Sequence, residues 1–281
     1  MRVRSLACLT ALSASLTVPA FAADSGRFVV LAPQTESAEW RDEAREMHRS
    51  GALQDMAQAL NSIFVLPTNI GLRYAECGEA NAYYDPSAHE ITMCLELMQS
   101  MAETLDGQFE DEDSTAEALA GAYLAVVLHE TGHALVDVLE IPVTGREEDA
   151  VDQLSAWMLI EADDADSVLG AAASYYTDDE ESASDDEFAD EHSLNRQRYF
   201  NLVCWAYGSD PENQQDLLES WGLPEARAER CEEEYAQLDR SWTRLLGEHL
   251  REDGDEAATV ATQPNKRAPM GSVKVVPARN D

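Results

Sequence analysis

Apolar side chains recur with helical spacing over most of this chain and alternate with polar ones only in an early stretch. Residues 27–32 and three extended segments between residues 70 and 94 are predicted strands, with a turn at 85–88. The predicted helices are 37–62 with a break at Gly51, 95–105, about 114–139, about 144–162, 193–206, 211–220 and 224–246. We therefore expect an α+β fold that is mainly helical, with a small antiparallel sheet before the longest helix.

Two capping patterns mark where the central helices should begin. Ser114 and Glu117 have the spacing of a capping box, and so do Thr144 and Glu147. The acidic stretch 106–113 should then be a loop ahead of the first of these helices.

The longest predicted helix contains the string His129-Glu130-Thr131-Gly132-His133. Positions i and i+4 share a helix face, so His129 and His133 can present ring nitrogens to one metal ion. Glu130 would project beside the metal, where a carboxylate can accept a proton from a metal-activated water. Gly132 has no side chain, which lets another segment approach closely.

The simpler alternative is an amphipathic helix whose histidines face water. The flanking residues 119–128 and 134–136 are apolar nearly all round, which predicts a buried helix instead. Two buried imidazoles and a carboxylate need a partner, and a metal is the usual one.

A third ligand is expected from the helix that begins near residue 147. The first helix continues for about 9 Å beyond His133. Residues 140–144, if extended, can span as much as ~16 Å in the opposite direction, so the next helix can begin near the histidines. Glu147, Glu148 and Asp149 compete for the role. We favour Glu148, because Asp152 shares its face one turn on and could accept the outer N–H of a ligand histidine. A plain acidic helix face remains the alternative.

The N-terminus has the pattern of a secretory signal, with Arg2 and Arg4, an apolar core and Ala20-Phe21-Ala22 as a cleavage site. Residues 1–22 are therefore a predicted signal peptide, 23–250 the domain and 251–281 a disordered tail. No later run reaches the about 20 apolar residues of a membrane span. We expect an exported protein, periplasmic or extracellular.

Four cysteines follow the signal, and an even number in an oxidising compartment suggests two disulfides. Four cysteines permit three pairings, and local spacing favours Cys77–Cys94 and Cys204–Cys231. Four buried free thiols are the alternative, which export disfavours. The formal charge of −36 argues against nucleic acid and anionic membranes as partners.

The segment 161–191 is rich in Asp and Glu and has no Lys or Arg, which favours a solvated surface loop. A calcium site there is the alternative, although no calcium-loop motif is present. Beyond it, His192 is the leading candidate for a donor to the oxyanion of peptide hydrolysis. Arg196 and Tyr199 share its predicted helix face, whereas Arg196 and Arg198 could simply neutralise the acidic loop.

The motif His129-Glu130-Thr131-Gly132-His133 with Glu148 and Asp152 resembles the zincin metallopeptidases whose third ligand is glutamate, the gluzincins. The flanks resemble an exported bacterial metallopeptidase family known mainly as a domain of unknown function; these flanks are 81–86, the strand ending at Cys94, 145–150 and 192–208. The likeness covers roughly residues 28–246.

The resemblance implies a zincin-like fold, Zn²⁺ held by His129, His133 and Glu148, Glu130 as general base and Asp152 as the residue that orients a ligand. The spacing from His133 to Glu148 is shorter than in the larger gluzincins, which leaves the third ligand open. We expect an exported zinc metallopeptidase acting on peptides or proteins. The alternative is a non-proteolytic zinc-binding envelope protein with a vestigial site.

Overall fold

The computed structural model describes residues 26–176 and 183–251. The predicted signal peptide, 1–22, and residues 252–281 of the predicted tail lie outside the described residues. Residues 177–182 of the acidic segment also lie outside them.

The N-terminal half contains all four strands and three helices. They are β1 (Phe28–Val30), α1 (Glu39–Ser50), α2 (Ala52–Ile63), β2 (Ile70–Ala75), β3 (Ala82–Asp85), β4 (Glu90–Cys94) and α3 (Leu95–Leu105). As predicted, a glycine separates the first two helices: Gly51 has a φ of 86°, a conformation that favours glycine.

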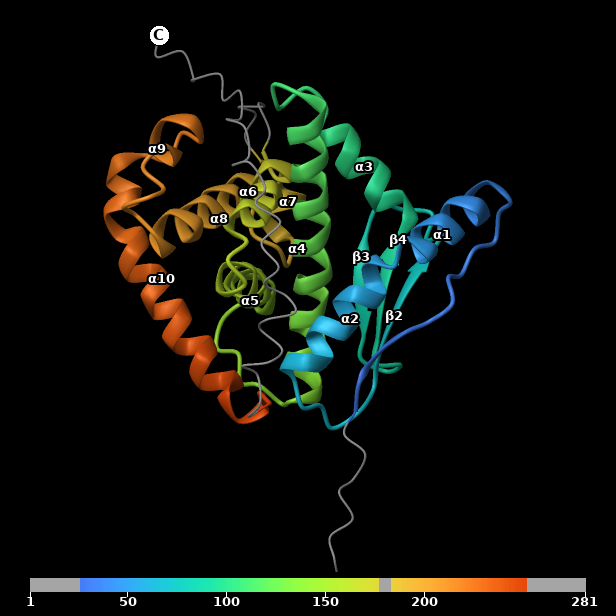
Figure 1. The fold of residues 1–281 in the computed structure, drawn as a ribbon. Coiled ribbons are helices and arrows are strands. Elements are labelled where there is room, and N and C mark those ends of the chain that lie inside the picture. Colours follow the sequence, from blue (N-terminus) through green and yellow to red (C-terminus); the bar gives the residue numbers. More distant parts are fainter. Residues whose placement is uncertain (1–25, 177–182, 252–281) are drawn as a thin grey trace, which may run out of the picture.

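The second half is helical. Its elements are α4 (Glu112–Val138), α5 (Glu147–Glu161), α6 (Ala165–Ser174), α7 (Asp185–Ala189), α8 (Asn195–Ser209), α9 (Leu217–Ser220), α10 (Glu225–Leu246) and a 3-10 turn, η1 (Gly247–His249). Helix α4 runs between the sheet with its helices and the C-terminal group of helices (Figure 1). The predicted α+β class is confirmed, although the helix predicted at 211–220 is reduced to α9.

The sheet is mixed, and the expectation of an antiparallel sheet was wrong. The strand order is β1-β2-β4-β3, with β1, β2 and β4 parallel and only β3 antiparallel to β4. The physical reason lies in burial: Ile91 and Met93 of β4 are 0% exposed, so β4 belongs inside the sheet. Strand β3 alternates half-buried and exposed positions, which suits an edge.

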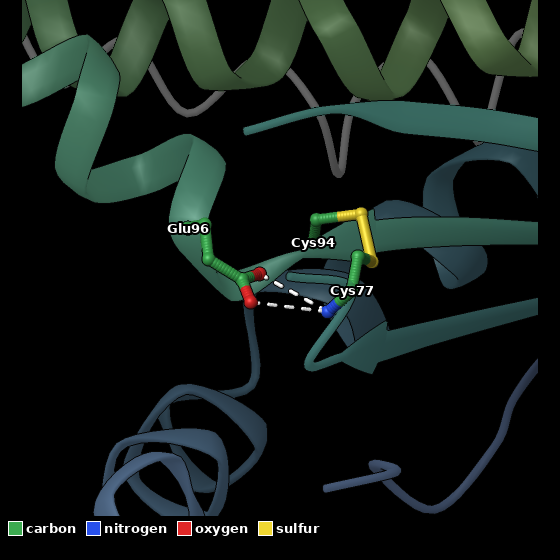
Figure 2. A group of neighbouring side chains, drawn as sticks. All are labelled: Cys77, Cys94 and Glu96. Carbon is green, nitrogen blue, oxygen red and sulfur yellow. Dashed lines mark hydrogen bonds between the residues drawn. A yellow bond between two sulfur atoms is a disulfide. The ribbon is translucent and has the colours of Figure 1, made fainter. Parts of the chain in front are cut away.

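A disulfide joins the ends of β2 and β4, as predicted. Cys77 and Cys94 are bonded, with Cα atoms 5.5 Å apart. Figure 2 shows Glu96, at the start of α3, beside this bridge; its carboxylate accepts hydrogen bonds from the backbone N–H of Cys77 (3.1 Å) and Gly78 (2.7 Å). Although two cysteines and a glutamate cluster here, the sulfurs are bonded to each other, so the group is structural.

Helix α4 begins one turn earlier than its capping pattern indicated. Asp111 is the N-cap, and its side chain accepts a hydrogen bond from the backbone N–H of Ser114 (2.8 Å). The predicted Thr144–Glu147 box is also absent, because α5 begins after Arg146 without a side-chain cap. By length and composition α4 could cross a membrane, but 61% of its apolar window is buried inside the protein, which is the behaviour of a core helix.

The segment 161–191 is not wholly a surface loop, because it contains the buried helix α6. Close approach of backbones makes this packing possible: a Cβ added to Gly121 of α4 would lie 2.7 Å from Ser167 Cα, and one on Gly170 would lie 2.6 Å from the Ala118 carbonyl oxygen. Asp164 caps α6 by accepting from the backbone N–H of Ser167 (3.3 Å), and it also accepts from the Ser167 hydroxyl (2.7 Å). Small residues thus place α6 directly against the helix that carries the histidines.

The second predicted disulfide joins helices α8 and α10. Cys204 of α8 and Cys231 of α10 are bonded, with Cα atoms 5.2 Å apart, and both residues are fully buried. Tyr199 of α8 donates a hydrogen bond to the Trp221 carbonyl oxygen (2.7 Å). These contacts fix α8, whose N-terminal end borders the site described next.

Candidate metal centre

Two neighbouring helices supply the central residues of the site. His129, Glu130 and His133 lie on α4, and Glu148 lies on the first turn of α5. A Cβ added to Gly132 would stand 2.8 Å from the Val151 Cβ, so the missing side chain lets α5 approach as predicted. Gly132 lies between the two histidines at the point where α4 touches α5. The close approach of the helices there brings Glu148 to the histidine pair.

The ring nitrogens of both histidines converge on Glu148. Its Oε2 lies 3.1 Å from His129 Nε2 and 3.3 Å from His133 Nε2. One ligand atom from each of these three residues lies within 4.8 Å of the other two. The two competing acids face elsewhere: Glu147 contacts the outer nitrogen of His133, Nδ1 (2.8 Å), and Asp149 accepts from the Ser193 hydroxyl (2.6 Å).

Asp152 lies behind His129, as the sequence predicts. Its Oδ1 lies 2.8 Å from His129 Nδ1, which leaves Nε2 directed toward Glu148. Sequence reasoning missed Arg198 of α8, which donates from Nε to Asp152 Oδ2 (2.7 Å) and from a terminal nitrogen to Oδ1 (2.6 Å). The Arg198 guanidinium also lies 4.0 Å from the centre of the Tyr175 ring.

The sequence feature that could have identified Arg198 is its position on an otherwise apolar helix face. It is 9% exposed and adjoins the buried Tyr199 and Leu202. A buried cation needs a buried anion, and only Asp152 among the acids of α5 is equally buried. Burial raises the pKa of Asp152, but His129 and Arg198 outweigh it and lower that pKa to about 2.

His192 joins the same carboxylate from the segment before α8. Its Nε2 lies 3.0 Å from Glu148 Oε2, and its ring stacks on that of His129 with centroids 6.1 Å apart. Asp190 Oδ1 lies 3.0 Å from its Nδ1 and accepts its backbone N–H. Arg196 and Tyr199 do not share this face: Arg196 is exposed and Tyr199 is buried in the core.

Glu130 is buried, and in the described part of the chain its side chain accepts no hydrogen bond. Its side chain borders the cleft at 6% exposure, and within residues 26–176 and 183–251 its carboxylate has no hydrogen bond or ion pair. Burial raises the pKa of this carboxyl group above its ordinary value. A buried carboxylate that accepts no hydrogen bond is costly, so its presence here indicates a group that meets a ligand.

Hydrogen bonds between Glu148 and the histidines lower the pKa of Glu148 and raise the pKa of His133. Burial alone would raise the pKa of Glu148, but contacts with His129, His133 and His192 hold it far below its usual range. Burial alone would lower the pKa of His133, yet Glu148 and Glu147 raise it to about 9. The site therefore concentrates negative charge that attracts a cation.

The site opens into a cleft of about 950 Å³. Its walls come from β3, α4, the start of α5, α7 and the segment leading into α8. The C-terminal helices thus contribute one wall. The three converging side chains are reached from solvent through this cleft.

Comparison with known proteins identifies the family. A family described as "Putative metallopeptidase" matches residues 33–246. The chain belongs to this metallopeptidase family. No match was found among curated proteins or solved structures.

Membership in the metallopeptidase family implies a metal, and the residues fit one. The converging side chains of His129, His133 and Glu148 lie inside residues 33–246, the range that the family matches. Two imidazole nitrogens and a carboxylate oxygen form a donor set that suits a catalytic divalent ion with a free coordination position. In the described part of the chain, the Cys77, Cys94 and Glu96 group is the other cluster of potential ligand residues, and its disulfide excludes the sulfurs as metal ligands.

Proposed function

We propose that this member of the metallopeptidase family is a zinc-dependent peptidase, with the ion held by His129, His133 and Glu148. The single observation that carries the proposal is the convergence of both Nε2 atoms on one Glu148 oxygen, at 3.1 and 3.3 Å. A third protein ligand from a second helix leaves one side of the ion open to the cleft. This arrangement follows the zincin interpretation made from the sequence.

The reaction needs a base beside the metal, and Glu130 fits that role. Zinc at this position would polarise the scissile carbonyl and lower the pKa of a water molecule to about 7. Glu130 accepts the proton of the attacking water and returns it to the departing amine. Its burial, its raised pKa and its lack of a competing partner in the described residues support this assignment.

Three residues position the ligands instead of binding the ion. Asp152 fixes His129 by accepting its Nδ1–H, so that Nε2 keeps a lone pair for the metal. Arg198 holds both oxygens of Asp152 and keeps this carboxylate charged. Glu147 positions His133 in a similar way, through its contact with Nδ1, and is more exposed than Asp152.

His192 is proposed as a donor to the oxyanion that forms on the substrate. Asp190 orients its ring through Nδ1, and its Nε2 lies within 3.0 Å of the acid proposed to bind the ion. Because His192 Nε2 lies this close to a proposed metal ligand, it can contact an oxygen of a substrate bound at the metal. Arg146 supports the segment by donating to the His192 carbonyl oxygen (3.1 Å).

The protein is proposed to work in an exported compartment. Its two disulfides indicate oxidising conditions, and the predicted signal peptide agrees with export to the periplasm or the medium.

The test compares Glu130→Gln with the wild type after loading with zinc. The matched control is Glu112→Gln, an exposed residue on the same helix. We expect wild type and control to cleave an unfolded protein substrate, and Glu130→Gln to keep its zinc but lose cleavage by about a hundredfold or more. Equal behaviour of all three proteins would instead favour a non-proteolytic zinc-binding role.

A further inference from the structure

The cleft has an acidic rim formed by six exposed carboxylates. These are Asp137, Glu147, Asp186, Glu187, Asp190 and Glu191. Within the described residues none of the six forms an ion pair with an arginine; their ionic contacts are with histidines. Arg198 also lines the cleft, but Asp152 already engages its charge.

The rim surrounds a ligand site and is not merely a patch of acidic surface. The carboxylate of Glu130 is buried, has no hydrogen bond or ion pair among the residues that the structure describes, and borders the same cleft, which indicates independently that a ligand enters it. Carboxylates around a concave wall focus a negative potential inside it, because field lines concentrate where low-dielectric walls exclude water. The rim therefore acts on the molecule that reaches the metal centre.

Another part of the wall suits the stems of long cationic side chains. Strand β3 contributes Tyr83, a large ring that is 42% exposed, and α4 contributes Val126 and Val136. Lys and Arg cover apolar surface with their carbon stems while the charged end stays near water or an acid, and a cation can also lie over a tyrosine ring. Aromatic and acidic walls together favour such side chains over neutral or acidic ones.

We propose that the cleft selects cationic peptides, with Arg or Lys close to the bond that is cleaved. The inference rests on the proposed peptidase function and names its substrate class. The rim attracts the basic side chains and repels acidic segments, while the metal centre and Glu130 act on the backbone between them.

The test uses three internally quenched peptides of the same length that carry Arg, Gln or Glu on both sides of the central bond. Each is assayed with the zinc-loaded full chain at low and high ionic strength. The cleft variant is Asp186→Lys with Glu191→Lys. The matched control, Glu229→Lys with Glu233→Lys, makes the same charge change at exposed positions of α10.

We expect kcat/KM for the Arg peptide to exceed that for the Gln peptide by about tenfold at low salt, with the Glu peptide slowest. Salt should reduce the preference. The cleft variant should lose most of the Arg-to-Gln ratio and the control should keep it. Equal cleavage of the three peptides, or an unchanged ratio in the cleft variant, overturns the inference and leaves the peptidase function standing.

If no peptide is cleaved, the peptidase function fails and the inference is judged by binding. Fluorescence anisotropy of the labelled Arg and Gln peptides is then measured on Glu130→Gln, with and without the two cleft substitutions. Tighter binding of the Arg peptide that disappears in the cleft variant upholds the substrate class. Equal binding of the two peptides overturns it.

Discussion

Arg198 holds Asp152 with two hydrogen bonds, one to each carboxylate oxygen, at 2.7 and 2.6 Å. The same carboxylate accepts from His129, so a residue of α8 controls a histidine of α4 through an acid of α5. All three side chains are buried. The C-terminal helices are thus part of the metal centre although they contribute none of the three proposed ligands.

Replacing Arg198 should weaken zinc binding. In Arg198→Met the Asp152 carboxylate is buried without its cation, and loss of such an outer partner typically costs about 10- to 100-fold in metal affinity. Competition with a chelating indicator measures the zinc Kd, and the visible spectrum of the cobalt-substituted protein reports the ligand geometry.

Arg196→Met is the matched control, since Arg196 is exposed two residues away on the same helix. Arg198→Lys should recover part of the affinity, because lysine restores the charge without the paired donors. An unchanged zinc Kd and cobalt spectrum in a folded Arg198→Met protein would contradict this positioning role.

Glu148 and Glu147 should differ in their importance for the metal although they are adjacent. Glu148→Gln removes the proposed third ligand, whereas Glu147→Gln changes a group that contacts the outer nitrogen of His133. We expect Glu148→Gln to lose zinc on dialysis and Glu147→Gln to retain it, measured by elemental analysis. The reverse result would make Glu147 the ligand.

Zinc should also raise the melting temperature of the wild type but not of Glu148→Gln, because a ligand that binds only the folded state stabilises it. Differential scanning calorimetry with and without a chelator makes this comparison. Equal shifts in both proteins would mean that the metal binds elsewhere.

The contact between α4 and α6 should not tolerate a side chain at Gly121. A Cβ there would lie 2.7 Å from the backbone of Ser167, so the helices must separate. We expect Gly121→Ala to lower the free energy of unfolding by about 1–3 kcal/mol, measured by urea denaturation. Gly247→Ala is the control, since nothing lies within 4 Å of its added Cβ; a gain of stability at Gly121 would refute the close contact.

The disulfide between α8 and α10 should stabilise the fold without acting on the metal. It closes a loop of 27 residues, for which chain entropy gives about 3 kcal/mol. We expect Cys204→Ser with Cys231→Ser to lose about that much stability in denaturant while its zinc Kd stays at the wild-type value. A protein equally stable with and without the bridge would show that the helix packing alone is sufficient.

Local patterns in the sequence predicted that His129, His133 and Glu148 lie together. His129 and His133 lie one helical turn apart in an apolar run, and Glu148 was favoured over its neighbours because Asp152 shares its face. Both disulfide pairings followed from separation along the chain and are confirmed. These features depend on helix periodicity and short connections, which a sequence displays directly.

Features that depend on distant contacts were missed. Arg198 meets Asp152 across 46 residues, and no local pattern joins them. Helix α6 was assigned to a loop because acids flank it, whereas its small residues pack against Gly121. The sheet was wrongly expected to be antiparallel, because strand direction depends on which strands pair: β4 lies between β2 and β3 and is parallel to β2.

The proposed binding of one zinc ion by His129, His133 and Glu148 can be tested by anomalous diffraction at the zinc edge, from crystals of the zinc-loaded protein. We expect one strong peak about 2.0–2.2 Å from both Nε2 atoms and a Glu148 oxygen. A protein that binds no zinc, or a peak away from these three side chains, would contradict it.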